Sequence, residues 1–152
     1  MVQPLQSDWS LLRYCSRPVQ IVPNAKTGGL KISSQAFKPR KGESGVSVDV
    51  EELRLRDGHP TSRNVPSLKN VLAVLRVKVH VARKFELNPV HEPIARNVLK
   101  LIPPNPYHAE LLGALKQKQL SKLRDACEIA LPIDVSAVSV VKSRLDRYGV
   151  PR

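Results

Sequence analysis

The thirteen prolines of this chain limit the lengths of its helices and strands more than any other feature. Proline fixes φ and lacks a backbone N–H, so it ends helices and is confined to the edges of sheets. Most of the prolines fall in the first two thirds of the sequence and divide it into short segments. Because short segments are typical of strands, we expect a strand-rich region over residues 17–112.

Three segments in this region have the pattern of strands. Residues 71–77, VLAVLRV, form the most continuous apolar run and include several valines, which predicts a buried central strand. Residues 19–22 alternate apolar and polar positions, and residues 107–113 end at a glycine, so both are predicted strands. A short helix is expected over 78–85, where apolar residues recur every third position.

The stretch over residues 31–53 combines strand patterns with a basic loop. Two alternating segments flank the sequence KPRKG at 38–42, which predicts either a hairpin or two adjacent strands. The loop gathers Lys38, Arg40 and Lys41, and cations beside free backbone N–H groups suit a phosphate. A solvated hairpin tip is the alternative, because the glycine and lysine spacing of a Walker loop is absent.

Two helices are predicted after this region. Residues 115–131 carry apolar side chains at three- and four-residue steps, and residues 134–148 follow with Asp134 as the N-cap. The outward face of the first helix is basic and is a second candidate for phosphate contacts, although any solvated amphipathic helix has such a face. Its cations are Lys116, Lys118, Lys122 and Arg124.

Together these segments predict one α+β domain over residues 1–152. It should contain a small mixed or antiparallel sheet with the two C-terminal helices packed on one face. We expect residues 1–16 to form an N-terminal arm and residues 57–68 to form a flexible loop.

No pattern points to secretion, a membrane or a metal. The first fifteen residues lack the basic start and apolar run of a signal peptide, and no segment has the roughly 20 apolar residues of a membrane helix. Two cysteines in such a chain predict free thiols in a reduced, cytoplasmic protein. The four histidines match no zinc spacing and no dinucleotide-binding glycine motif occurs, so we expect neither metal nor cofactor.

The net charge of +12 is spread along the chain, without a basic tail. An even excess of positive charge attracts polyanions, so nucleic acid is the expected partner. Aromatic residues make up only 4% of the chain, which disfavours stacking on single-stranded bases and favours contacts to a duplex backbone. A basic subunit that meets an acidic protein partner is a further alternative.

A small enzyme is the rival class. His108 and Glu110 lie two residues apart, so a strand places both on one face, where they can act as an acid–base pair. Arg17 and Ser34 complete this candidate catalytic set. Arginines also flank Cys15, and nearby cations lower the pKa of a thiol, although a lone cysteine in a strand is more often a buried apolar group.

Four short motifs resemble those of a group of small uncharacterised bacterial proteins. They are RPV at 17–19, SQAFKP at 34–39, GVSVD at 45–49 and HAE at 108–110. The group shows an arginine, a Ser-x-Ala-Phe-x-Pro element, a Leu-Ser-Val-like element and a late His-Ala pair; here valine precedes the serine. The resemblance spans about two thirds of the chain in short motifs and implies a bacterial origin without a function.

The order of an early arginine, two serines and a late glutamate is also similar to the order in ADP-ribosyltransferases. In this chain Arg13 or Arg17, then Ser33 and Ser34, then Glu110 occupy those places, without the threonine of the middle motif. This similarity implies the enzymatic alternative.

We therefore predict a basic binding protein, rather than an enzyme, whose loop and helix cations contact nucleic acid. One structural observation bears on the choice. Convergence of Arg17, Ser34, His108 and Glu110 in one pocket favours the enzyme, whereas a continuous basic face favours binding.

Overall fold

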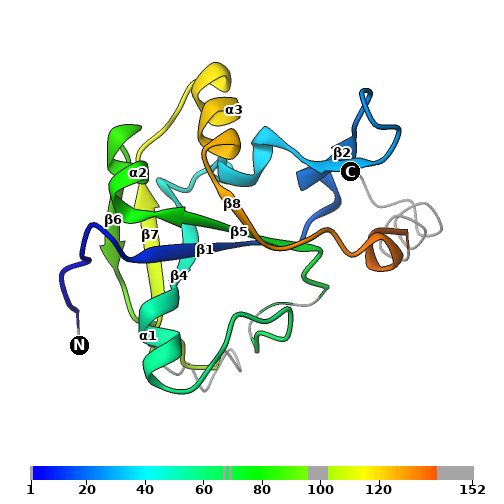
Figure 1. Ribbon diagram of the computed structural model, residues 1–152. Helices are drawn as coiled ribbons and strands as arrows, with labels where there is room; N and C mark the ends of the chain where they lie inside the picture. The colour runs from blue at the N-terminus through cyan, green and yellow to red at the C-terminus, as the bar shows by residue number, and fades with distance from the viewer. Residues whose placement is uncertain (1, 67, 69, 96–102, 140–152) are drawn as a thin grey trace.

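The computed structural model describes residues 2–66, 68, 70–95 and 103–139. Its centre is a six-stranded antiparallel sheet in the order β6-β7-β4-β1-β5-β8, and a separate pair, β2 and β3, lies apart from it (Figure 1). The strands are β1 (Ser10–Cys15), β2 (Ile21–Pro23), β3 (Leu30–Ile32), β4 (Gly45–Val50), β5 (Ala73–Lys78), β6 (Asn88–His91), β7 (His108–Leu112) and β8 (Glu128–Leu131).

The helices are short, as the prolines require. They are α1 (Glu51–Arg56), α2 (Val79–Lys84) and α3 (Gln117–Asp125), with 3-10 turns η1 (Pro18–Gln20) and η2 (Ser34–Phe37). A further helix begins over residues 135–139, where Asp134 Oδ1 accepts the N–H of Ala137 at 3.1 Å as an N-cap. The predicted α+β class is confirmed.

The sheet has two unlike faces because successive residues of a strand point to opposite sides. On β1, Leu11 and Cys15 belong to the larger core, which side chains from α2 and α3 complete. Leu12 and Tyr14 belong to a smaller core. Four of the β4 and β7 residues that share the face of Leu12 are polar: Ser47, Asp49, His108 and Glu110.

The middle of the sheet is forked. β1 pairs with β5 over the whole strand, but it pairs with β4 only at Leu11–Val50 and Leu12–Asp49. Continued register would set Tyr14 opposite Ser47, yet no pairing forms there. We call this separation the β1–β4 fork, and it brings polar side chains from both strands to one opening.

Three sequence predictions about this fold are wrong. Residues 10–15 are an inner strand of the sheet rather than part of an N-terminal arm, because Leu11 and Leu12 are completely buried. The segments on either side of the basic loop do not pair: β3 forms a hairpin with β2, and β4 joins the main sheet. The helix predicted over 115–131 ends at Asp125, and residues 128–131 pair with β5 as β8.

Other predictions are confirmed. The apolar run at 71–77 supplies β5, and the short helix at 78–85 is α2. Residues 57–66 contain no helix or strand, as expected of a loop, and Val65 anchors them in the smaller core. The end of the helix predicted over 134–148 lies outside the described residues. Among those residues no helix is long and apolar enough to cross a membrane.

A bidentate ion pair joins α1 to β5. Arg76 donates from Nε and Nη2 to the two carboxylate oxygens of Glu51, each at 2.8 Å, and Thr61 also donates to this carboxylate. Burial raises the pKa of Glu51, but the hydrogen bonds from Arg76 and Thr61 outweigh it and hold the pKa below 4.5. A depressed carboxyl pKa stabilises the fold above the pKa of the unfolded chain, and the stabilisation is lost as the pH falls through the folded value.

We expect Glu51→Gln to lower the free energy of unfolding at pH 7 by about 1–3 kcal/mol, since a charged hydrogen-bonded pair is lost. The difference from the wild type should shrink as the pH falls below about 4, where the wild-type carboxyl also becomes neutral. Urea unfolding at pH 7, 5 and 3 measures both. The exposed Glu128, 3.4 Å from Arg76, provides the matched control Glu128→Gln, which should change little. A gap that is undiminished at pH 3 would contradict this assignment.

Candidate functional site at the β1–β4 fork

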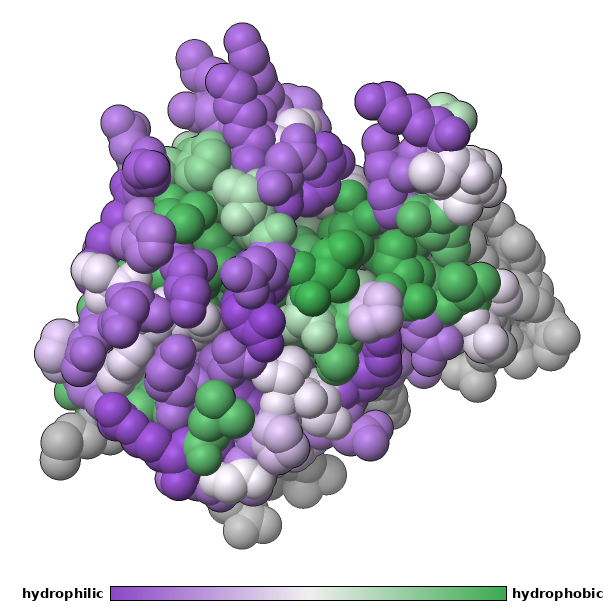
Figure 2. All heavy atoms as spheres, in the orientation of Figure 1, coloured by the Kyte–Doolittle hydropathy of each residue, from purple (hydrophilic) through white to green (hydrophobic). Residues whose placement is uncertain are grey.

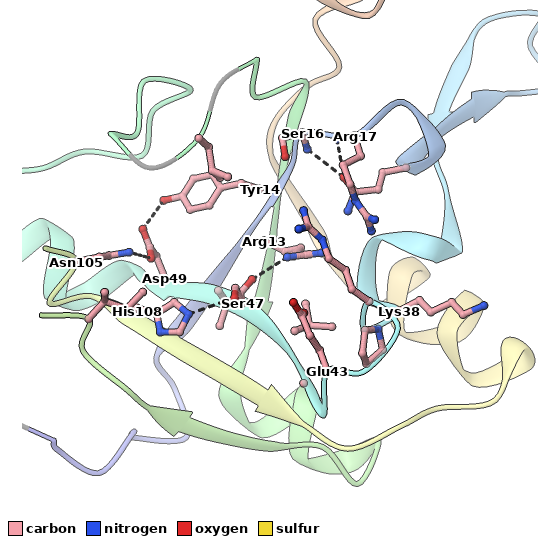
Figure 3. A pocket seen from close by; sticks show the side chains of 18 residues that line it. Arg13, Tyr14, Ser16, Arg17, Lys38, Glu43, Ser47, Asp49, Asn105 and His108 are labelled. Atoms are coloured by element: carbon pink, nitrogen blue, oxygen red, sulfur yellow. Dashed lines mark hydrogen bonds between the residues drawn. The ribbon is translucent and has the colours of Figure 1, made fainter. Parts of the chain in front are cut away.

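A cavity of about 280 Å³ lies at the fork. Its walls come from β1, η1, the basic loop, β4, and the Asn105 and His108 ends of the connection into β7. Figure 3 shows the labelled side chains in two groups, with the cations of Arg13, Arg17 and Lys38 on one side and Asp49, Asn105 and His108 on the other. Ser47 lies between the groups (Figure 3).

The first group is cationic. Arg13, Arg17, Lys38 and Arg40 all line the cavity, and the lining acids are Glu43 and the buried Asp49. Among the described residues, Arg17, Lys38 and Arg40 form no ion pair. Several positive charges therefore share one concave surface with little compensation.

The cations disfavour one another's charge. The pKa of Arg13 is lowered to about 10, chiefly by burial, and the charges of Arg17 and Arg40 contribute against the opposing effects of Cys15 and Glu110. Burial also lowers the pKa of Arg17, and Arg40 contributes. An anion bound between these side chains would relieve this repulsion.

Arg13 spans the fork. Its Nε donates to the carbonyl oxygen of Ala36 at 2.6 Å, and its Nη1 donates to the carbonyl oxygen of Ser47 at 2.9 Å. The guanidinium thus satisfies a β4 carbonyl beside the place where the β1–β4 ladder stops. Its Nη2 group has no partner among the described residues, which leaves donors for a ligand.

The second group is centred on Asp49, which is buried and receives three hydrogen bonds. Tyr14 donates to Oδ2 at 3.0 Å, Arg54 donates to the same oxygen at 3.3 Å, and Asn105 Nδ2 donates to Oδ1 at 2.9 Å. Burial, followed by the charge of Asp49, raises the pKa of Tyr14. This carboxylate is fully engaged, so its role is to position Tyr14 and Asn105 in the wall.

Ser47, His108 and Glu110 form a triangle of side chains on the polar face. Ser47 lies directly opposite Glu110 in the β4–β7 register, and His108 is opposite Asp49. His108 Nε2 is 3.2 Å from Ser47 Oγ and 3.2 Å from Glu110 Oε1, and the Ser47 hydroxyl donates to that same Oε1 at 3.2 Å. Ser47 is exposed, whereas His108 is buried.

The backbone fixes the tautomer of His108. Its Nδ1 is 2.8 Å from the carbonyl oxygen of Glu92, which only accepts hydrogen bonds, so Nδ1 carries a proton and donates it. In the neutral ring the lone pair is then on Nε2, which faces Ser47 Oγ. A serine hydroxyl within hydrogen-bond distance of both an oriented imidazole nitrogen and a carboxylate has proton acceptors beside it, which is the geometry of an activated hydroxyl.

The structure brings part of the predicted catalytic set together. Arg17 and His108 line the cavity, and Glu110 contacts His108 on the same strand face, as their spacing predicted. Ser34 does not join them, because its hydroxyl accepts a hydrogen bond from Gln117 of α3 at 2.6 Å and lies outside the lining. Ser47 takes the place predicted for Ser34.

Only some of the predicted phosphate-binding cations line the cavity. Lys38 and Arg40 line the cavity, whereas Lys41 and the α3 cations do not. On α3, Lys116, Lys118 and Lys122 are exposed, and Arg124 is half-buried and pairs with Asp125 at 2.9 Å.

Sequence reasoning missed Ser47, Asp49 and Asn105 as cavity residues and named Arg13 only as an alternative to Arg17. A signal was present in β4, where valines at 46, 48 and 50 define the core face and leave the serine and the aspartate on the other. Cys15 is the buried apolar group that its strand pattern favoured over a reactive thiol, and the pKa of its thiol is raised to about 11, chiefly by burial and despite the opposing charge of Arg13. Both cysteines are free.

A second hollow, of about 530 Å³, is mainly apolar. Figure 2 shows an apolar patch around β8 that extends toward the β2–β3 pair. The residues that line the hollow are Leu30, Ile32, Leu75, Arg124, Asp125, Cys127, Ile129, Pro132, Ile133 and Val135. They include no histidine or serine. Among the described residues, no group of three or more His, Cys, Asp or Glu side chains is placed to hold a metal ion.

Comparisons with protein-family models, with curated proteins and with solved structures find no match to this chain.

We expect Asp49→Ala to lower the free energy of unfolding by about 3–5 kcal/mol, because the buried guanidinium of Arg54 loses its carboxylate. Tyr14→Phe removes one neutral donor and should cost about 1 kcal/mol. Chemical unfolding monitored by circular dichroism measures both, with the exposed Asp57→Ala as control. If Asp49→Ala were as mild as Asp57→Ala, the central role of this carboxylate would be wrong.

Proposed function

We propose that this protein binds a phosphate-bearing ligand, a strand of nucleic acid, in the cavity at the β1–β4 fork. The observation that carries the proposal is the convergence of Arg13, Arg17, Lys38 and Arg40 on one concave surface. Cations with free donors and little compensation by acids suit phosphate oxygens, which accept several charge-assisted hydrogen bonds. The net charge of +12 adds long-range attraction for a polyanion.

The shape of the cavity favours a single strand over a duplex. Its volume of about 280 Å³ is near the lower end of small-molecule sites, which suits one nucleotide unit. A duplex presents its phosphates on a broad convex surface, whereas a flexible strand can place one phosphate inside a pocket. We therefore favour single-stranded contacts, in place of the duplex contacts that composition suggested.

The alternative predicted binding surface is the exposed cation row of α3. Its cations do not line the cavity at the fork, and Arg124 is already paired with Asp125. We therefore assign the specific contact to Arg17 and Arg40, and a nonspecific attraction to the α3 lysines.

A pair of double variants tests this assignment at equal loss of charge. We expect Arg17→Ala/Arg40→Ala to weaken binding of a fluorescent single-stranded oligonucleotide by about tenfold or more, roughly 1.4 kcal/mol, because two phosphate contacts are lost. The control Lys118→Ala/Lys122→Ala removes two charges outside the cavity and should have a smaller effect. Fluorescence anisotropy across a salt series measures affinity and slope, and the slope should fall by about one to two for the cavity variant.

Competition identifies the group that is recognised. Inorganic phosphate should displace the oligonucleotide at concentrations where chloride of equal ionic strength does not. Equal weakening by the two double variants, or no binding at low salt, would overturn the proposal. Tighter binding of a duplex than of the single strand would overturn the choice of strand.

A further inference from the structure

Packing of the core does not require the triangle of Ser47, His108 and Glu110. The larger core lies on the other face of the sheet, and Ser47 is exposed at the cavity rather than packed. Its hydroxyl nevertheless lies 3.2 Å from an imidazole nitrogen whose tautomer is fixed by a backbone carbonyl. A hydroxyl, a base in contact with it, and a third group that orients the base are the three parts of an activated nucleophile.

We propose that Ser47 is a nucleophile and that the cavity hydrolyses phosphodiester bonds of a nucleic-acid strand. This inference rests on the proposed function, because it needs a phosphate held beside Arg13. The geometry places the two close together: Arg13 Nη1 donates to the carbonyl oxygen of Ser47, the same residue whose hydroxyl contacts His108. Arg13 and Ser47 line the same cavity, and Nη2 of Arg13 has no partner among the described residues. A phosphate held by this group would therefore lie beside the residue that carries the nucleophile.

The first step transfers the phosphoryl group to the protein. The Ser47 O–H bond breaks and its proton passes to His108 Nε2 while Oγ forms a bond to phosphorus. The P–O bond to the leaving sugar oxygen breaks on the opposite side, and that oxygen takes a proton from solvent at the open mouth of the cavity. Charge that develops on the phosphoryl oxygens faces the guanidinium groups of Arg13 and Arg17.

The second step releases the phosphoryl group from Ser47. Water attacks phosphorus opposite Ser47 and loses a proton to solvent, the Oγ–P bond breaks, and Oγ takes its proton back from His108 Nε2. The net reaction consumes one water and yields one alcohol and one phosphate monoester, so no oxidant, reductant or cofactor is required.

Glu110 has a different role from His108. Once Nε2 is protonated, the imidazolium N–H lies 3.2 Å from Glu110 Oε1, a distance suited to an ion pair. Glu110 thus stabilises the charged ring between the two steps and acts as a positioning residue. The neutral variant Glu110→Gln should lower the turnover number while leaving oligonucleotide affinity unchanged, and it should change the pH profile of turnover.

Covalent trapping with a fluorophosphonate probe tests the nucleophile directly. We expect one adduct, which peptide mapping places on Ser47, and none in Ser47→Ala. The control is Ser44→Ala, which removes a second exposed serine three residues away and should label like the wild type. His108→Ala should label about 100-fold more slowly, and added imidazole should restore part of the rate. Labelling that persists in Ser47→Ala would overturn the inference.

Two chromogenic substrates test the reaction and its substrate class. We expect release of nitrophenolate from bis(4-nitrophenyl) phosphate, with a loss of at least about 100-fold in Ser47→Ala and in His108→Ala. Faster release from the monoester 4-nitrophenyl phosphate would overturn the diester assignment. Circular dichroism confirms that the variants are folded, and His108→Gln serves as a second variant if His108→Ala unfolds.

The experiments distinguish a failure of oligonucleotide binding from a failure of hydrolysis. Ser47→Ala should bind the single-stranded oligonucleotide like the wild type, because Ser47 is uncharged and the cations are intact. If the wild type binds the oligonucleotide but neither labels nor hydrolyses the diester, the inference is overturned and the proposed function stands. If the wild type labels at Ser47 but binds no oligonucleotide, the proposed function and the nucleic-acid substrate class both fail.

Discussion

The guanidinium of Arg13 is the interaction on which the cavity depends. A sheet that opens in the middle leaves backbone carbonyls without ladder partners, and buried carbonyls are costly when unpaired. Arg13 supplies one of the missing donors, to Ser47, also donates to Ala36 of η2, and still has donors left over. Lysine carries a single charged nitrogen and lacks the rigid planar fork that reaches two carbonyls at once. The same side chain therefore pairs with a backbone carbonyl at the fork and presents positive charge inside the cavity.

This arrangement places like charges close together, which is electrostatically unfavourable. Besides burial, the charges of Arg17 and Arg40 lower the pKa of Arg13, and the charge of Arg40 lowers the pKa of Arg17; nothing in the described part of the chain neutralises all three charges. Stability alone would favour pairing each arginine with a carboxylate or moving it to solvent. Unrelieved repulsion in a concave site is instead typical of positions selected for a ligand of opposite charge. The argument for an anionic ligand is thus independent of the overall basicity of the chain.

The sequence predicted local structure better than long-range pairing, for a physical reason. A period of two placed His108 and Glu110 on one face, and an apolar run identified β5, because both signals are carried by neighbouring residues. Partner choice depends on distant residues. Pairing of β3 with β2, and the switch from α3 to β8 near Cys127, were therefore not predictable from pattern. Ser47 was also missed, because the contact that makes it a candidate joins it to His108, sixty-one residues away in the sequence.

The backbone at the two ends of the β6–β7 connection sets the polar wall of the cavity. Ile94 and Asn105 form an antiparallel bridge, and the N–H of Glu92 donates to the carbonyl oxygen of His108 just inside it. The bridge holds Asn105 where its side-chain amide reaches Asp49. Because these pairings join backbone to backbone, the place of Asn105 and His108 in the wall does not depend on which side chain stands at position 94.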